Sequence, residues 1–288
     1  MTKDTPAADI YRYASITSPR GIQCHPADAL TYPSHCRTSV TERWRDLVQG
    51  TLDEGARATS RGFACLERLG EKIIIDMQAP VVLSRERKLG YHFMCAEAAW
   101  LLDGDNKVAT IAPFSRRIAS FSDDGVTFFG AYGPRLLPQL AYVLKTFAED
   151  AGSRQAVATI WRENPPKTKD CPCSLSAQWL IREGRLHCML NMRSSDIWLG
   201  VPYDIFNFSM LSRYLLKKLP PGLALGDLHL YAGSSHLYEK DAAQAAEAAR
   251  SNEVIEAPIN LAALDAAPPD KLASALWAMA RQEGGKDV

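Results

Sequence analysis

The sequence lacks any long hydrophobic run. No stretch approaches the roughly eighteen consecutive apolar residues that a membrane-spanning helix needs. The N-terminal residues MTKDTPAADIYRYAS also contain no basic segment followed by an apolar one, which is the pattern of a secretory leader. We therefore expect a cytoplasmic protein that does not enter the membrane.

Net charge and a dense set of cysteines are absent as well. Lys and Arg together number 33, and so do Asp and Glu, so no excess charge attracts nucleic acid or anionic lipid. The seven cysteines are odd in number and spread along 288 residues, unlike the disulfide framework of a small secreted domain. We expect reduced thiols, one of which can serve in catalysis.

The pattern of apolar residues predicts both helices and strands. With 47% hydrophobic and 23% charged residues, the chain has the composition of a folded protein with a full core. Helices are expected at 38–55, where Thr41 is the candidate N-cap, and at 91–104, 205–218, 239–253 and 270–282. Strands are expected as two segments within 71–84, and at 125–133, 155–161, 176–184, 185–192 and 227–238. Their irregular alternation predicts an α+β (mixed α/β) fold.

The composition changes twice along the chain. Residues 1–40 are rich in Pro, Ser, Thr and His without a sustained period, which predicts an irregular N-terminal extension. One catalytic domain is expected over 41–241. An Ala-rich helical tail follows over 242–288, and we expect it to pack on the same domain.

Cysteine and histidine residues form two groups that are candidate metal sites. Cys171 and Cys173 form a C-x-C pair, and Cys24-His25 with His35-Cys36 form a second group. Neither has the usual ligand spacing on both sides, so we expect no metal. Cys173 instead lies between a Pro and a Ser in a segment that also contains arginines, and nearby cations stabilise a nucleophilic thiolate. An inert buried thiol is the alternative.

The stretch LGVPYDIFNFSMLSRYLLKK, residues 199–218, places Asp204 directly before apolar residues at helical spacing. An Asp there is typical of an N-cap, because its carboxylate accepts hydrogen bonds from the first-turn N–H groups. From this stretch alone, a cap is the expected role of Asp204.

Six segments together resemble the thymidylate synthase family, which includes the pyrimidine nucleotide hydroxymethylases. In chain order they are EAAWLLDGDNK, GAYGPRL, SRQAVATIW, PCSLSAQW, MRSSDIWLGVPYDI and GDLHLYAGSSHLY. They keep the order and nearly the spacing of the family from about residue 55 to residue 240. The resemblance implies a large mixed sheet flanked by helices, with the sheets of two subunits packed back to back in a homodimer.

The resemblance also implies roles for the reacting residues. Cys173 matches the nucleophile that adds to C6 of the pyrimidine, and Glu97 matches the carboxylate that manages protons and ordered water at the base. Arg193 matches a phosphate-binding arginine and Ser194 follows in the same block. Planar arginine forks suit a phosphate dianion, and their charge would favour the thiolate.

Further residues match the remaining parts of the family's site. Arg154 matches an arginine that the family lends to the phosphate site of the neighbouring subunit, and Arg61 is our choice for the last phosphate arginine. Asp196 matches a residue near the folate pterin, while His236 and Tyr238 match groups that hold the sugar hydroxyl. The implied cosubstrate is 5,10-methylenetetrahydrofolate.

Asp204 stands where thymidylate synthases have an Asn that pairs with uracil. Deoxycytidylate hydroxymethylases carry the same Asn-to-Asp exchange. A carboxylate accepts from N4 of cytosine, and a proton on Asp204 or on N3 completes the second hydrogen bond. Uracil would set its O4 lone pairs against a carboxylate, at a cost of roughly 1–3 kcal/mol or more. Asp204 is thus also predicted to read the base.

The resemblance predicts 5-hydroxymethylation of a cytidine 5′-monophosphate, with dCMP favoured over CMP. Cys173 would add to C6, the one-carbon unit would move to C5, and water would add to the exocyclic methylene. Ser174, Gln155 and Met192 depart from the usual His, Arg and Gln of thymidylate synthases, which fits a hydroxymethylase better. The alternatives are a dUMP hydroxymethylase or divergent thymidylate synthase, and a non-catalytic nucleotide- or RNA-binding relative.

Overall fold

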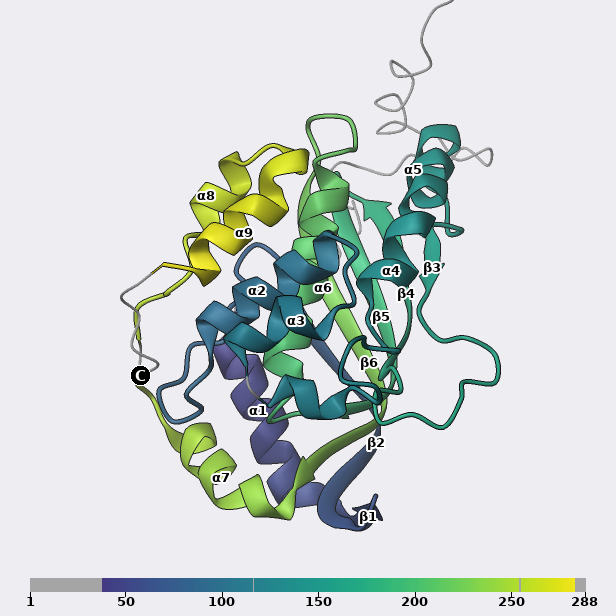
Figure 1. The fold of residues 1–288 in the computed structure, drawn as a ribbon. Helices are drawn as coiled ribbons and strands as arrows, with labels where there is room; N and C mark the ends of the chain where they lie inside the picture. The colour runs from purple at the N-terminus through teal and green to yellow at the C-terminus, as the bar shows by residue number, and fades with distance from the viewer. Residues whose placement is uncertain (1–37, 116, 254, 283–288) are drawn as a thin grey trace, which may run out of the picture.

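The structure, a computed structural model, describes residues 38–115, 117–253 and 255–282 (Figure 1). It has the predicted mixed α+β fold, with helices packed on a six-stranded sheet of order β1-β2-β6-β5-β4-β3. The strands are β1 Ala56–Ser60, β2 Phe63–Asp76, β3 Val157–Thr159, β4 Ser174–Arg182, β5 Arg185–Asp196 and β6 Ala224–Tyr238.

The sheet is antiparallel at every junction except one. β5 and β6 run parallel, in a register that pairs Ser194 with Ser234 and Asp196 with His236. The predicted Glu-Gly turn joins β4 to β5, and both of its residues, Glu183 and Gly184, have positive φ angles of 51° and 70°. Because β5 and β6 end side by side, the residues at their carboxyl ends reach the same edge of the sheet.

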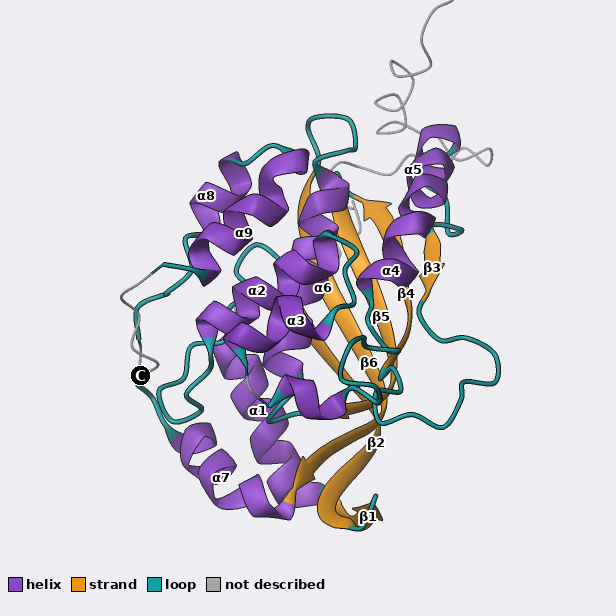
Figure 2. Ribbon diagram, viewed as in Figure 1, coloured by secondary structure: helices purple, strands orange, loops and turns teal. Residues whose placement is uncertain are grey.

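Helices cover one face of this sheet, as Figure 2 shows for α1, α2 and α6. The α-helices are α1 Val40–Glu54, α2 Tyr91–Leu102, α3 Val108–Ile111, α4 Gly133–Leu136, α5 Leu140–Glu149, α6 Val201–Leu216, α7 Ala242–Arg250, α8 Leu261–Ala266 and α9 Leu272–Ala280. Short 3-10 helices occupy Ala112–Phe114, Ile118–Phe121, Leu137–Gln139, Glu239–Asp241 and Pro269–Lys271.

The core lies between α6 and the sheet. Alternate residues of β5, among them Leu186 and Leu190, are fully buried, and so are Phe208 and Leu211 of α6. Burial follows the two-residue period of a strand in β5 and the helical period in α6. In β6 the same alternation places Tyr231, which is 37% exposed, on the other face of the sheet.

Three local predictions were wrong. Residues 125–133 form no strand and contribute only an isolated bridge from Thr127 to Lys107, and residues 80–84 are not a second strand after the Pro. The cap of α1 is Ser39 rather than Thr41, because Ser39 forms a capping box with Glu42. Thr41 instead accepts a hydrogen bond from the backbone N–H of Leu83.

The C-terminal helix α9 packs against α2. Trp277 of α9 donates through Nε1 to Asp103 at the end of α2, at 2.6 Å, and its ring lies 5.5 Å from that of Phe114. The domain boundaries at 41 and 241 remain a prediction, and nearly all of the expected extension over 1–40 lies outside the described residues.

Candidate active site

Cys173 immediately precedes β4 and faces β5. The backbone N–H of Arg193 donates to the carbonyl of Cys173 at 2.8 Å, so the nucleophile candidate is tied to the neighbouring strand. The next residue, Ser174, is fully buried and its N–H donates to the hydroxyl of Tyr132 at 3.2 Å. These bonds fix the backbone on both sides of the thiol.

Arg193 and Ser194 bracket the sulfur of Cys173. The guanidinium of Arg193 donates to the carbonyls of Pro172 (2.8 Å) and Cys171 (3.0 Å), and its Nη2 lies 3.8 Å from Sγ. The hydroxyl of Ser194 also lies 3.8 Å from Sγ. Two hydrogen-bond donors are therefore held beside the thiol, as a site for an anionic ligand requires.

The environment of Cys173 does not make it a resting thiolate. Burial raises the pKa of the thiol above its ordinary value, while Arg193 lowers the pKa, Asp204 raises it, and Ser194 and Arg61 lower it. Because burial dominates, the thiol keeps its proton near neutral pH. The arginines thus have less effect on the thiol than the sequence led us to expect.

Glu97 projects from α2 into the same region. Its Oε2 accepts a hydrogen bond of 2.8 Å from Nδ2 of Asn207, on α6. Burial raises the pKa of Glu97 to about 7, although the bond from Asn207 lowers it. A carboxyl that titrates near neutral pH is suited to exchange protons with a substrate.

Asp204 lies inside the first turn of α6 and does not cap it. The helix begins at Val201 with Gly200 in the cap position, and no side chain makes a capping bond. The predicted cap is wrong because the Gly-Val-Pro segment already takes helical geometry, with Pro202 at an N-terminal position where its missing N–H costs nothing. Asp204 is left free to face the site.

The environment of Asp204 disfavours its charged form. Burial raises its pKa well above the ordinary value, and the nearby carboxyls of Glu97 and Asp196 raise it further. Asp204 is also close enough to Cys173 and Tyr132 to act on their pKa values. A protonated carboxyl offers one donor and one acceptor.

Asp196, His236 and Tyr238 lie at the adjoining ends of β5 and β6. Oδ1 of Asp196 accepts from the N–H groups of Trp198 (2.9 Å) and Leu199 (2.8 Å), which leaves Oδ2 for a ligand. His236 packs edge-on against Tyr238, at 5.2 Å between ring centroids. Nδ1 of His236 is buried without a hydrogen-bond partner within the part of the chain that the structure describes.

The two remaining predicted arginines are placed differently. Arg61 lies in the turn between β1 and β2 with φ at +51°, and its charge acts on both Cys173 and Tyr238. Arg154 is exposed and precedes β3, where its carbonyl accepts from Gln178. Among the described residues no hydrogen bond or ion pair joins Arg154 to the Cys173 site.

Two residues of this region were missed from the sequence. Asn207 follows Asp204 by three positions, and residues at that spacing share one face of a helix. Once Asp204 was assigned to the site, this spacing could have identified Asn207. Tyr132 lies in the GAYGPRL segment, but nothing in its sequence environment distinguishes it from a core aromatic residue.

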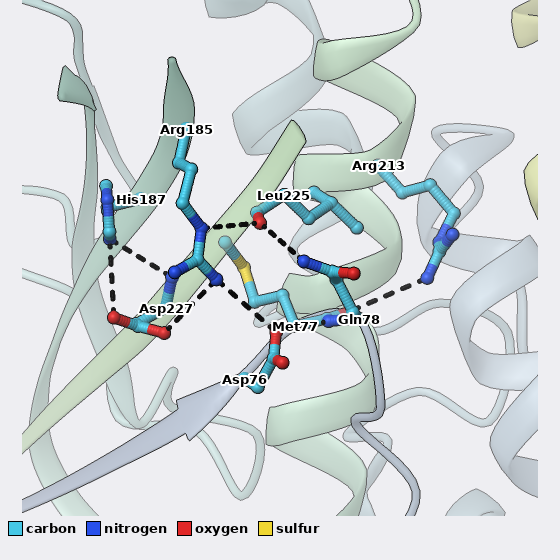
Figure 3. A network of polar contacts seen from close by, with 8 residues as sticks. All are labelled: Asp76, Met77, Gln78, Arg185, His187, Arg213, Leu225 and Asp227. Atoms are coloured by element: carbon cyan, nitrogen blue, oxygen red, sulfur yellow. Dashed lines mark hydrogen bonds and ion pairs between the residues drawn. The ribbon is translucent and has the colours of Figure 1, made fainter. Parts of the chain in front are cut away.

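A second polar network lies at the opposite end of β5 and β6 (Figure 3). His187, Asp227 and His229 place ligand-type atoms within 4.8 Å of one another, the geometry of a candidate metal site. However, Arg185 lies 3.7 Å from Asp227, and the N–H of Asp227 donates to Nδ1 of His187 at 3.1 Å. The carboxylate and the imidazole are therefore already engaged by protein groups. The candidate metal group Cys24-His25 with His35-Cys36 lies outside the described residues.

Two findings bear on what kind of protein carries this site. Across the described ranges, no helix has the length and apolar character needed to cross a membrane. A family model described as thymidylate synthase matches residues 42–267, which is well over half of the chain and includes every predicted site residue.

Proposed function

The chain belongs to the thymidylate synthase family, and from that premise we propose that it is a 5-hydroxymethylase of a cytidine 5′-monophosphate. The family transfers a one-carbon unit to C5 of a pyrimidine nucleotide, with methylenetetrahydrofolate as the donor. We place dCMP ahead of CMP as the substrate. The observation that carries the proposal is the position of Asp204 on the first turn of α6, near enough to Cys173 to act on its pKa and in an environment that raises the pKa of its own carboxyl.

A protonated Asp204 suits cytosine for a specific reason. Its O–H can donate to N3 and its carbonyl oxygen can accept from the N4 amino group. A neutral carboxyl could also turn to pair with uracil, so pairing alone does not discriminate. Cytosine N3, however, can take the proton itself, which gives a charge-assisted pair about twice as strong as a neutral one. Uracil N3 already bears a hydrogen and cannot.

The reaction would begin at Cys173. The thiol loses its proton to water as sulfur bonds to C6, and the electron pair of the C5–C6 double bond becomes available at C5. A proton on N3, received from Asp204, makes C6 more electrophilic. Glu97 would then accept the C5 proton or order the water that adds to the exocyclic methylene.

The donor cosubstrate would be held near the ends of β5 and β6. Oδ2 of Asp196, which no described group engages, fits a partner with N–H donors such as a pterin ring. When bound, methylenetetrahydrofolate supplies the one-carbon unit. Arg193, Ser194 and Arg61 would bind the nucleotide phosphate, and His236 and Tyr238 would bind the sugar.

The test is to incubate the purified protein with methylenetetrahydrofolate and, separately, dCMP, CMP and dUMP, and to identify each product by mass. We expect a gain of one CH₂O unit on dCMP, with less on CMP. A gain of CH₂ on dUMP would instead identify a thymidylate synthase. Absence of product with all three nucleotides, together with measurable nucleotide binding, would favour the non-catalytic relative.

We further propose that the protein acts as a homodimer in which Arg154 reaches the partner's phosphate site. Arg154 is exposed, and no hydrogen bond or ion pair among the described residues joins it to the Cys173 site of its own chain, which supports this arrangement. Inactive Cys173→Ala and Arg154→Ala chains, mixed under exchange conditions, should regain about a quarter of the wild-type activity, because half of the dimers then contain one intact site. Cys173→Ala mixed with Arg193→Ala is the control and should regain none. Equal behaviour of the two mixtures would rule out the shared site.

A further inference from the structure

Glu97 and Asp204 form a pair of partly buried residues whose carboxyls are contributed by two helices. Glu97 comes from α2 and Asp204 from the first turn of α6, and the charge of Glu97 raises the pKa of Asp204. Two carboxylates in one low-dielectric region disfavour simultaneous ionisation. The pair therefore favours a state in which one carboxyl carries a proton and the other is ionised.

Asn207 distinguishes the two carboxyls. Its Nδ2 donates to Oε2 of Glu97 at 2.8 Å, and its side chain is buried with 5% exposure. An N–H donor stabilises the ionised form of the carboxyl that accepts from it. Asp204 lies one helical turn earlier on the same face of α6, and no hydrogen bond of the described residues engages its carboxyl.

The amide of Asn207 is held in one orientation. Its Oδ1 is buried without a hydrogen-bond partner among the described residues, so all of its bonding to the protein runs through Nδ2. The reversed amide would set the lone pairs of Oδ1 against those of an ionised Glu97. Charge on Glu97 and the observed amide orientation thus favour each other.

The groups around the two carboxyls also disfavour a charge on Asp204. Asp204 is faced by Glu97 from α2 and by Asp196 from the end of β5, and both disfavour its charged form. Asp204 also acts on Tyr132 and Cys173, and burial raises the pKa of each. Arg193 and Arg61 act on Cys173.

We propose that Asn207 is a positioning residue that keeps the charge on Glu97 and so leaves the shared proton on Asp204, where N3 of a cytosine can receive it. This inference rests on the proposed function, because N3 of cytosine can accept the proton and N3 of uracil cannot. It assigns the base role to Glu97 and the acid role to Asp204.

The test replaces Asn207 with Leu, which has a similar shape but no donor. Carboxyl titration is followed by infrared difference spectroscopy on the resting protein, with Glu97→Gln and Asp204→Asn to identify the two bands. We expect the midpoint of Glu97 in Asn207→Leu to rise by about one pH unit. The acid limb of kcat/KM should move by the same amount, a roughly tenfold loss at pH 6 with less than about threefold at pH 9.

Two variants serve as controls. Asn207→Ser keeps a donor and should restore part of the wild-type midpoint. Ser209→Ala alters another buried polar side chain of α6 on a different face, and it should leave both profiles unchanged. A loss of activity that is equal at all pH values in Asn207→Leu, with the Glu97 midpoint unmoved, would overturn the proposal.

The two readouts separate this inference from the proposed function. Infrared titration needs no turnover, so it tests the assignment of the proton even if none of the nucleotides is converted. Conversely, hydroxymethylation of dCMP with an unmoved Glu97 band in Asn207→Leu would support the function and reject the role of Asn207.

Discussion

Replacement of Cys173 by Ala is expected to abolish release of tritium from C5-labelled dCMP, with a rate loss of roughly 10⁴-fold or more. Without the thiol, no bond forms to C6 and C5 does not become nucleophilic. Removal of Sγ deletes the two long hydrogen bonds from Arg193 and Ser194, but the backbone bond between Cys173 and Arg193 remains. Nucleotide binding, measured by calorimetry, should therefore persist.

Cys171→Ala is the matched control. Cys171 lies two residues away, is partly buried, and contacts Arg193 only through its backbone carbonyl. We expect near wild-type tritium release from it. Full release from Cys173→Ala would exclude covalent catalysis by this residue, and equal losses in both variants would indicate disruption of the loop instead.

Asp204→Asn should shift the preference from cytosine toward uracil nucleotides. The amide of Asn can pair with either base, depending on which way it is turned, but it cannot transfer a proton to N3 of cytosine. Loss of a charge-assisted bond costs about 1.5–3 kcal/mol, so the ratio of kcat/KM for dCMP over dUMP should fall roughly ten- to a hundredfold. Product formation from both nucleotides over time measures this ratio.

Asp227→Asn is the comparison variant for Asp204. Asp227 is also a buried carboxyl, but it lies near the start of β6, at the far end of the strand from His236. Its replacement should leave the dCMP to dUMP ratio unchanged. If the ratio were equally unchanged in Asp204→Asn, Asp204 would not read the base.

The sequence predicted the fold through two kinds of pattern. Alternating residues of β4 and β5 and the Glu183-Gly184 turn specify a hairpin locally, so this part was predictable. The segment at 125–133 is rich in β-branched and aromatic residues, but it finds no neighbouring strand apart from the bridge at Thr127. Strand formation depends on a partner, which a local pattern does not reveal.

Candidate site residues were predictable where they match family segments. Their protonation states, which depend on the surrounding side chains, were less so. The resemblance singled out Cys173, Glu97 and Asp204 by position. In the structure Glu97 acts on the pKa of Asp204 and Asp204 on that of Cys173, while their roles stay a prediction. Their protonation was not predictable, because it depends on burial and on which side chains face each other across α2 and α6. Asn207 was missed for the same reason, since its contact with Glu97 joins residues 110 positions apart.

The buried carboxyl of Glu97 also links the stability of the fold to the proton concentration. Its pKa is 4.5 in an ordinary environment and about 7 here, so between these values the folded chain binds a proton that the unfolded chain has lost. This stabilisation is complete below pH 4.5 and is lost as the pH rises through 7, a difference of up to about 3 kcal/mol. The protein therefore loses part of its stability against unfolding in the same pH range in which Glu97 becomes an effective base.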